Sequence, residues 1–254
     1  MKKSRDLLLS LLTAAVCLIP QPAVAFGLEA AVGYWWQNPS GDIQFKGDRL
    51  DVEDDFGYET EARPFGRIRV DLPAFLPNIY LMATPMEFEE SATRNVTFTF
   101  GDQTFSAGVP FGSKIKLDQY DIALFYSLPF LREATLGKLN ADLGVNVKVI
   151  DLEAVVSQSL AGVSASQSAT VPVPMLYAGL QLAPVERFGI EAEGRGIAFS
   201  SNHYVDLIGR VKVKLIGPLF GAAGYRYQDI EFDVQDVLGS FQFQGPFVEV
   251  GVRF

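Results

Sequence analysis

Charged side chains fall on alternate positions in two neighbouring segments of the chain, residues 188–195 and 203–215. The first segment carries mainly acidic residues on this parity, and the second carries basic ones. Opposite charges at facing positions of adjacent strands pair with each other. The six residues are Glu191, Glu193, Arg195, Arg210, Lys212 and Lys214. We expect them either to form a salt-bridged plug or to line a charged passage for small solutes.

The chain's one histidine, His203, follows Ser200, Ser201 and Asn202. A nucleophilic serine needs a histidine within hydrogen-bond reach and a third group that orients the histidine. Ser201 shares the strand parity of His203, and Glu193 or Asp206 would be the third group. However, no hydrolase motif matches in spacing or order, and the alternative is a polar loop histidine. We therefore expect no catalytic residue and no enzyme activity.

Metal and cofactor sites have little support in the sequence. An acidic run at residues 51–55 lacks the alternating aspartates and glycine of a calcium loop. The chain's one cysteine, Cys17, precedes the expected mature chain, which would then contain neither a disulfide nor a thiolate ligand. No glycine-rich phosphate loop is present. We expect no metal and no cofactor.

The N-terminal 25 residues have the features of an export signal. Lys2, Lys3 and Arg5 precede a short apolar stretch, and Ala23-Val24-Ala25 matches a cleavage site. The stretch is shorter than the ~20 residues that a membrane-spanning helix needs. We predict a signal peptide over 1–25, with a retained anchor as the alternative, and one mature domain over 26–254.

The chain is acidic, and this limits its partners. Residues 1–25 carry three basic residues and one acidic residue, so removing them changes the net charge from −9 to −11. An acidic chain lacks the basic patch that nucleic acid requires, so we expect no nucleic-acid partner. The same charge argues against docking on anionic lipid as a peripheral protein.

Apolar residues recur with a period of two along most of residues 26–254, which predicts strands. Ten segments qualify, with eight as the alternative number. They are 27–37, 64–72, 77–90, 113–128, 138–153, 172–183, 186–198, 203–215, 218–229 and 243–254. Short turns alternate with longer loops at 38–63, 91–112, 154–171 and 230–242. An even count puts both ends on the short-turn rim, and residues 97–106 are expected to form a hairpin tip that extends the third and fourth strands.

Three features favour a membrane barrel over a soluble sandwich. The strands are about ten residues long, which suits a tilted bilayer crossing. The chain closes on an aromatic residue that is preceded by alternating apolar residues. Aromatic residues also gather near strand ends, as interfacial girdles do: Tyr34, Trp35, Trp36, Phe75, Tyr80, Phe130, Phe188, Tyr225 and Tyr227.

The closing run Phe247-Val248-Glu249-Val250-Gly251-Val252-Arg253-Phe254 resembles the last strand of small Gram-negative outer-membrane β-barrel proteins of uncharacterised function. In that class, the barrel-assembly machinery reads a terminal phenylalanine with alternating apolar residues, here Val250, Val252 and Phe254. The resemblance implies an all-β, closed antiparallel transmembrane barrel with short periplasmic turns and longer extracellular loops. It also implies a place in the outer membrane, among lipid and lipopolysaccharide.

If the apolar faces meet lipid, the charged faces meet the lumen. This expected inward set is Glu29, Arg67, Arg69, Asp71, Asp121, Asp142, Lys148, Glu191, Glu193, Arg195, Arg210, Lys212, Lys214, Arg226, Glu249 and Arg253. Pro85, Pro172, Pro174 and Pro246 lack a backbone N–H, so we expect them at strand ends. The functional hypotheses are a structural barrel or passive small-solute channel, an outer-leaflet lipid-modifying enzyme, and an adhesin acting through the loops.

Overall fold

The computed structural model describes residues 26–254 except 74, 101, 201 and 235–236. The expected signal peptide lies outside the described residues and stays a prediction. The strands are β1 (Gly27–Phe45), β2 (Arg49–Asp51), β3 (Glu61–Asp71), β4 (Asn78–Thr84), β5 (Glu87–Ala92), β6 (Phe98–Phe100), β7 (Gln103–Phe105), β8 (Phe111–Ser127), β9 (Leu139–Gln158), β10 (Val163–Val185), β11 (Phe188–Phe199), β12 (Asn202–Lys214), β13 (Leu219–Val234) and β14 (Val237–Arg253).

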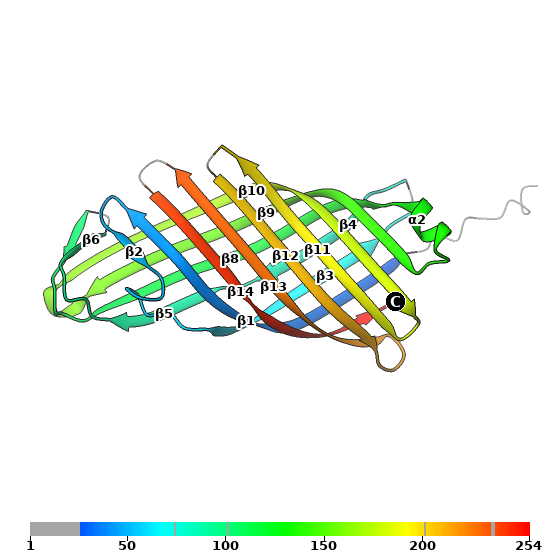
Figure 1. Cartoon of the computed structure of the whole chain (residues 1–254), viewed down its shortest axis with the longest axis horizontal. Coiled ribbons are helices and arrows are strands. Elements are labelled where there is room, and N and C mark those ends of the chain that lie inside the picture. The colour runs from blue at the N-terminus through cyan, green and yellow to red at the C-terminus, as the bar shows by residue number, and fades with distance from the viewer. Residues whose placement is uncertain (1–25, 74, 101, 201, 235–236) are drawn as a thin grey trace, which may run out of the picture.

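In the described part of the chain, ten antiparallel strands form one closed barrel, as Figure 1 shows. The ten strands of the wall are β1, β3, β4 with β5 as one strand, and β8 to β14. Each pairs with the next wall strand along the chain, and β14 closes the sheet on β1. At the seam, the backbone N–H of Phe254 donates to the carbonyl of Leu28 at 2.9 Å. The closed all-β barrel and the strand number predicted from the sequence are confirmed, in favour of ten over eight.

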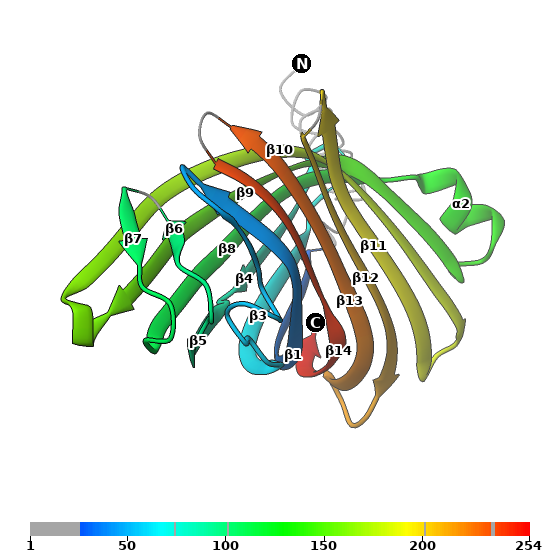
Figure 2. The same cartoon turned by 60° about the vertical axis from the view of Figure 1, so that its left-hand side comes forward.

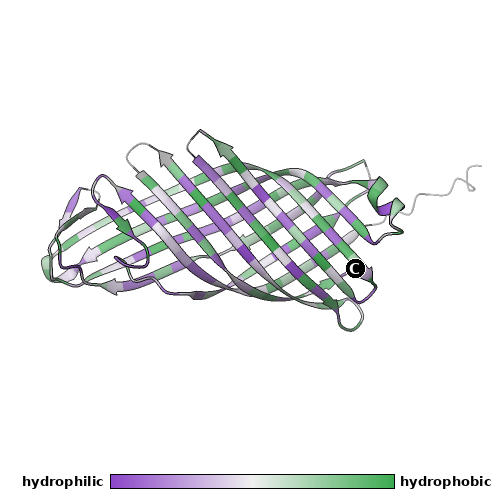
Figure 3. Cartoon of the chain, in the orientation of Figure 1, coloured by the Kyte–Doolittle hydropathy of each residue, from purple (hydrophilic) through white to green (hydrophobic). Residues whose placement is uncertain are grey.

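The outer face changes from apolar to polar at one level of the wall. On β8, Tyr126, Leu124, Ile122 and Tyr120 point outward and are exposed, and Asp118 follows them on the same face. Tyr120 lies opposite Val149 of β9, which lies opposite Pro172 of β10, so the apolar band ends at the same level on three adjacent strands. Figure 3 shows the alternation of hydrophobic and hydrophilic positions along the strands. An apolar band of this kind suits the hydrocarbon of a bilayer.

Several strands continue well past this band, which corrects the predicted strand ends. β1 continues to Phe45, and β9 and β10 continue to a turn at Ser159–Gly162, so most of the predicted loop 154–171 is a hairpin. Segment 230–242 is likewise mostly strand. Figure 1 shows β8, β9 and β10 projecting beyond the β11–β12 hairpin on the long-loop side. Outside the bilayer the outward face becomes polar, so the apolar alternation that marked these strands disappears.

The predicted girdle is also corrected at two aromatic residues. Tyr34, Trp36 and Tyr225 face outward and are exposed. Trp35 and Tyr80, in contrast, are buried inside the barrel, because they lie on the inward parity of β1 and β4. The short connection between β8 and β9 contains a short helix, α2 (Pro129–Ala134). Within the residues that the structure describes, no helix is long and apolar enough to cross a membrane.

Prolines mark the breaks in the backbone ladder, and three of the four predicted at strand ends, Pro172, Pro174 and Pro246, lie within strands. Because Phe254 and Leu28 exchange hydrogen bonds, the even-numbered residues of β14 point their N–H groups toward β1. Pro246 is one of these positions, and the β1–β14 pairing is interrupted there, between Trp35 and Asn38. Beside this break, the indole N–H of Trp35 donates to the carbonyl of Gly245, at 3.2 Å. Pro85 separates β4 from β5, and Pro174 lies within β10.

Phenyl rings close the long-loop end of the interior, and we call this cluster the aromatic cap. It comprises Phe56, Tyr58, Phe88, Phe98, Phe105, Phe111, Phe241 and Phe243, all buried. The ring of Phe98 stacks on Phe105 and packs against Phe111, each with centroids 5.0 Å apart. Burial raises the pKa of the Tyr58 phenol. The hairpin expected at residues 97–106 is present as β6–β7, but it is a separate two-stranded sheet in the cap and not the tip of a longer ribbon.

A test of the cap is Phe105→Ala. Phe105 is fully buried, and truncating such a ring costs about 3–5 kcal/mol. We expect limited proteolysis to cleave residues 93–110 much faster in this variant, while the heat-dependent gel shift of the barrel stays as in the parent chain. Phe75→Ala is the control, because Phe75 is 78% exposed on the short-turn side. Equal cleavage rates in the two variants would contradict the packing.

Candidate functional site: the charged interior

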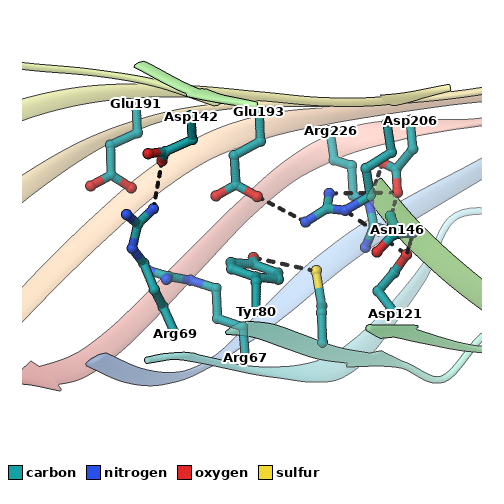
Figure 4. Close-up of polar contacts among 12 residues, drawn as sticks. Arg67, Arg69, Tyr80, Asp121, Asp142, Asn146, Glu191, Glu193, Asp206 and Arg226 are labelled. Carbon is teal, nitrogen blue, oxygen red and sulfur yellow. Dashed lines mark hydrogen bonds and ion pairs between the residues drawn. The ribbon is translucent and has the colours of Figure 1, made fainter. Parts of the chain in front are cut away.

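The charged inward faces meet inside the barrel and form a network of ion pairs below the aromatic cap. Alternation of side chains along each strand directs these groups inward. Figure 4 shows acidic and basic side chains from strands around the wall pointing toward one another. Most of them are buried: Glu29, Arg67, Arg69, Asp121, Asp142, Lys148, Arg195, Asp206, Arg210, Arg226 and Glu249. The network has three levels, stacked from the short-turn rim toward the aromatic cap.

The level nearest the short-turn rim joins β1, β3, β9, β11 and β12. The Lys212 ammonium lies 2.6 Å from Glu191 and 2.8 Å from Glu29, so one cation bridges two carboxylates. On the other side of the rim, Arg69 contacts Asp142 at 2.8 Å. Asp142 also accepts hydrogen bonds from Ser127, Asn140 and Gln181. A buried carboxylate with this many donors has most of its lone pairs satisfied.

The middle level crosses the barrel. Arg67 on β3 donates two hydrogen bonds to Glu249 on β14, at 2.9 and 2.7 Å, in the bidentate geometry that suits a guanidinium. Arg67 also contacts Glu29 at 2.7 Å. On the facing wall, Arg210 pairs with Glu193, and Arg195 donates to the same carboxylate at 2.9 Å. Each acid at this level therefore contacts an arginine from another strand or from its own.

The innermost level is the most deeply buried. The Lys148 ammonium contacts Asp121 at 2.8 Å and Asp206 at 3.0 Å, and all three side chains have no exposed surface. Arg226 donates two hydrogen bonds to Asp206 at 2.9 and 2.7 Å. The amides of Gln119 and Gln228 bond to each other directly above, linking β8 to β13. Two aspartates and two cations thus balance each other at the centre of the barrel.

Aromatic rings fill the space between these charges. The guanidinium of Arg226 lies 4.8 Å from the Trp35 ring, and that of Arg195 lies 5.0 Å from Tyr80. A cavity in the barrel interior measures only about 10 Å³. It is lined by Trp35, Phe65, Met82, Ile208, Arg210, Arg226 and Phe247. That volume is close to the minimum that one water molecule needs. At this level the interior is packed with side chains.

Small residues make this dense filling possible. Gly224 on β13 lies opposite Phe247 on β14, and a Cβ at Gly224 would overlap the phenyl ring. On strands β1 and β3, Gly33 lies opposite Phe65, and a Cβ at Gly33 would likewise overlap the ring of Phe65. A ring that folds over a facing glycine occupies the lumen without pushing the strands apart.

The structure places five of the six residues singled out from the sequence in this network. Glu191, Glu193, Arg195, Arg210 and Lys212 make the contacts given above. Lys214, the sixth, is exposed at the short-turn rim, and no ion pair joins it to a described residue. Asp71 and Arg253, also in the expected inward set, lie at the rim and are partly exposed. The rim residues differ because the barrel is open to water at that end.

Sequence analysis missed the central part played by Asp206. Its parity on β12, shared with Arg210 and Lys212, would have placed it inside. The sequence instead suggested Asp206 as an orienting group for His203. Gln119 and Gln228 were missed as well, because uncharged amides gave no signal beyond their inward parity.

His203 lies on the outer face of the wall, at the long-loop end of β12. Its ring nitrogens lie 3.2 Å from Glu231 and 3.5 Å from Asp229, both on β13. Asp206 and Glu193, the suggested orienting groups, point into the lumen and are engaged by arginines. His203 is at an odd position of β12 and faces outward, whereas Asp206 is at an even position and faces the lumen. Asp206 therefore cannot orient the ring of His203, which corrects the suggested triad. Ser201 lies outside the described residues.

The acidic run at residues 51–55 stabilises a turn. Asp51 accepts hydrogen bonds from the backbone N–H groups of Glu53 and Asp54, each at 2.8 Å. Asp55 pairs with Arg94 at 2.9 Å. Among the residues that the structure describes, no group of three or more histidine, cysteine, aspartate or glutamate side chains is placed to hold a metal ion.

The residues of the closing motif have two different positions. Val250 and Val252 face outward on β14 and pair with β13 and with β1 across the seam. Phe254 is 71% exposed, while its backbone completes the seam with Leu28. Reading of these residues by the barrel-assembly machinery stays a prediction.

No family model matches the chain, and no curated protein matches it. Solved structures do. The outer membrane protease OmpT from Escherichia coli is 9% identical with a TM-score of 0.54, over 92% of this chain and 99% of that one. The translocator domain of the autotransporter NalP from Neisseria meningitidis is 13% identical with a TM-score of 0.44, over 99% of this chain and 96% of that one. Ail of Yersinia pestis, solved with the heparin analogue sucrose octasulfate, is 12% identical with a TM-score of 0.39, over 90% and 99%.

The likeness to OmpT shows that the fold is that of a Gram-negative outer-membrane β-barrel. The expectations for fold and location from the closing motif are thereby confirmed. At this identity the likeness gives no residue a role.

The buried network predicts a large difference between two lysines. Lys148→Met leaves Asp121 and Asp206 short of a cation in a dry interior, and we expect it to cost about 3–5 kcal/mol of unfolding free energy. Lys116→Met is the matched control, because Lys116 pairs with Asp118 on the partly exposed outer face and should cost less than about 1 kcal/mol. Urea unfolding in lipid vesicles, followed by tryptophan fluorescence, measures both. Equal losses would show that the interior is hydrated.

Proposed function

We propose that this outer-membrane β-barrel protein is a closed, non-conducting scaffold that holds its extracellular extension rigidly above the membrane. The observation that carries the proposal is the ion-pair network across the interior, which lies beneath the aromatic cap and leaves little free volume. A barrel filled in this way has no room for a solute in its interior. Its working part is then the portion outside the bilayer.

The passive channel is the nearest alternative, and the interior argues against it. A conducting barrel needs a continuous water-filled path, and its charged rings must leave the ion or solute free to pass. Here the inward charges bind one another, as Lys148 does with Asp121 and Asp206. A solute would have to break these contacts in a region of low dielectric, where an unpaired charge is costly.

The extension supports a scaffold role. β8, β9 and β10 continue past the apolar band as one three-stranded sheet. The cap packs against the inner side of this sheet through residues such as Phe111 and Val156. Both features hold the extension in one shape, which suits a part that contacts something outside the cell.

Planar bilayer recording tests the closed interior. With the purified, heat-shifting barrel we expect no conductance steps. The triple variant Tyr80→Ala, Arg195→Ala, Arg226→Ala removes the bulk at the centre, and we expect discrete steps from whatever fraction of it remains folded. Reproducible steps from the parent chain would overturn the proposal and favour the channel.

The lipid-modifying alternative has its own test. Glu193 and Asp206, the suggested orienting groups, face the lumen and pair with arginines there, so we expect His203→Ala to leave the mass spectrum of lipid A unchanged relative to the parent chain. Asp229→Asn, which removes a neighbouring acid on the same outer face, is the control for surface effects. A lipid A species that disappears with His203 alone would show that the protein is an enzyme.

A further inference from the structure

The extracellular half of β10 has a partner on only one side. β10 pairs with β9 from Val163 to Leu182, but it pairs with β11 only from Leu176 onward. Figure 2 shows the arm formed by β8, β9 and β10 diverging from β11 and its neighbours. Residues 163–175 therefore have one open edge, and among the described residues no strand pairs with it. Most of this edge lies beyond the apolar band, which ends at Pro172.

The direction of each backbone group on this edge follows from the ladder. The N–H of Ala183 donates to the carbonyl of Lys138, and the β9–β10 register stays constant from there. Hydrogen-bonding direction alternates along a strand, so odd-numbered residues of β10 face β9 and even-numbered residues face the open edge. The positions facing outward in the plane of the sheet are Ser164, Ser166, Ser168, Thr170, Pro172 and Pro174.

The two prolines explain where β11 leaves β10. Pro174 and Pro172 are the next two positions that would bond to β11 after Leu176, and neither has an N–H. They block the edge near the membrane. Above them, Ser164, Ser166, Ser168 and Thr170 offer four N–H and four carbonyl groups.

This upper edge lacks the usual devices against pairing. Natural edges carry charges, especially lysine, or bulges. Between Val163 and Val185 the chain has no charged residue, and its register with β9 is regular throughout. Small serine and alanine side chains also let a second backbone approach closely. An edge of this kind is a template for another strand.

The sequence indicates which strand fits. Residues 163–171 read Val-Ser-Ala-Ser-Gln-Ser-Ala-Thr-Val, which is nearly the same in both directions about Gln167. In an antiparallel pair of two copies centred on Gln167, valine faces valine, alanine faces alanine, and serine faces serine or threonine. The even positions then face even positions, so about eight backbone hydrogen bonds form.

We propose that the open edge of β10 pairs with the same edge of a second copy of this chain, antiparallel and in register about Gln167. The twofold axis of such a pair is perpendicular to the sheet. In a barrel wall that direction is parallel to the membrane plane, so the axis places the two barrels in facing membranes. The extension thus joins two outer membranes. The inference rests on the proposed function only in taking the extension as the working part.

Disulfide trapping tests the pairing and its register. In a Cys17→Ser background, Gln167→Cys places two cysteines at a non-hydrogen-bonded pair, with Cα atoms about 4.5 Å apart, within disulfide range. We expect this variant to form covalent dimers between vesicles under mild oxidation. Ala165→Cys alone faces Ala169 of the other copy and should not crosslink, whereas Ala165→Cys mixed with Ala169→Cys should. Crosslinking that is absent at Gln167, or equal at every position, would overturn the proposal.

Vesicle aggregation tests the backbone contact itself. Ser166→Pro with Ser168→Pro removes N–H groups that face only the open edge, and prolines already occupy this parity of β10. We expect at least a roughly tenfold slower aggregation of vesicles carrying this variant, with an unchanged heat-dependent gel shift. Ser166→Ala with Ser168→Ala keeps both N–H groups and should aggregate as the parent does. Aggregation that is unaffected by the prolines would overturn the proposal, whereas conductance by the parent in the same vesicles would bear only on the closed interior.

Discussion

Pairing of every backbone donor and acceptor in the hydrocarbon is the constraint on which the rest of this structure depends. A sheet meets it only by closing on itself, which β14 and β1 achieve here. Closure fixes the alternation of side chains around the whole wall, so one parity meets lipid and the other meets a narrow interior. The charged network is a consequence of that geometry. Side chains that are polar enough to avoid lipid are forced together, and they are tolerated because each finds an opposite charge.

Breaks in the ladder occur where the constraint is relaxed. Pro246 interrupts the seam, and beside the break the indole N–H of Trp35 donates to the carbonyl of Gly245. Pro172 and Pro174 end the pairing of β10 with β11 at the level where the apolar band ends. There water can satisfy the free backbone groups, so the ladder is no longer obligatory. The positions of the prolines therefore mark the transition from wall to extension.

The sequence predicted the wall well and the extension poorly, for one physical reason. Alternation is visible only where one face is apolar, as at Leu143, Val145 and Val147. In residues 163–171 the outward face carries serine and threonine, so the pattern looked like a loop although the backbone is a strand. Inward parity predicted that Arg67, Glu249 and Lys148 share the interior. Which of them touch across the lumen depends on strand tilt and stagger, which a single sequence does not reveal.

The pairing of Arg67 with Glu249 joins residues 182 positions apart in the chain. Lys148 likewise pairs with Asp206, which lies 58 positions later in the chain. Strands entering the bilayer one at a time would carry these charges without partners. The order of assembly is therefore constrained: the chain must stay hydrated until its last strand is present, and only then can the interior dry. Insertion of this protein is for that reason expected to be a single cooperative event with no stable half-built intermediate.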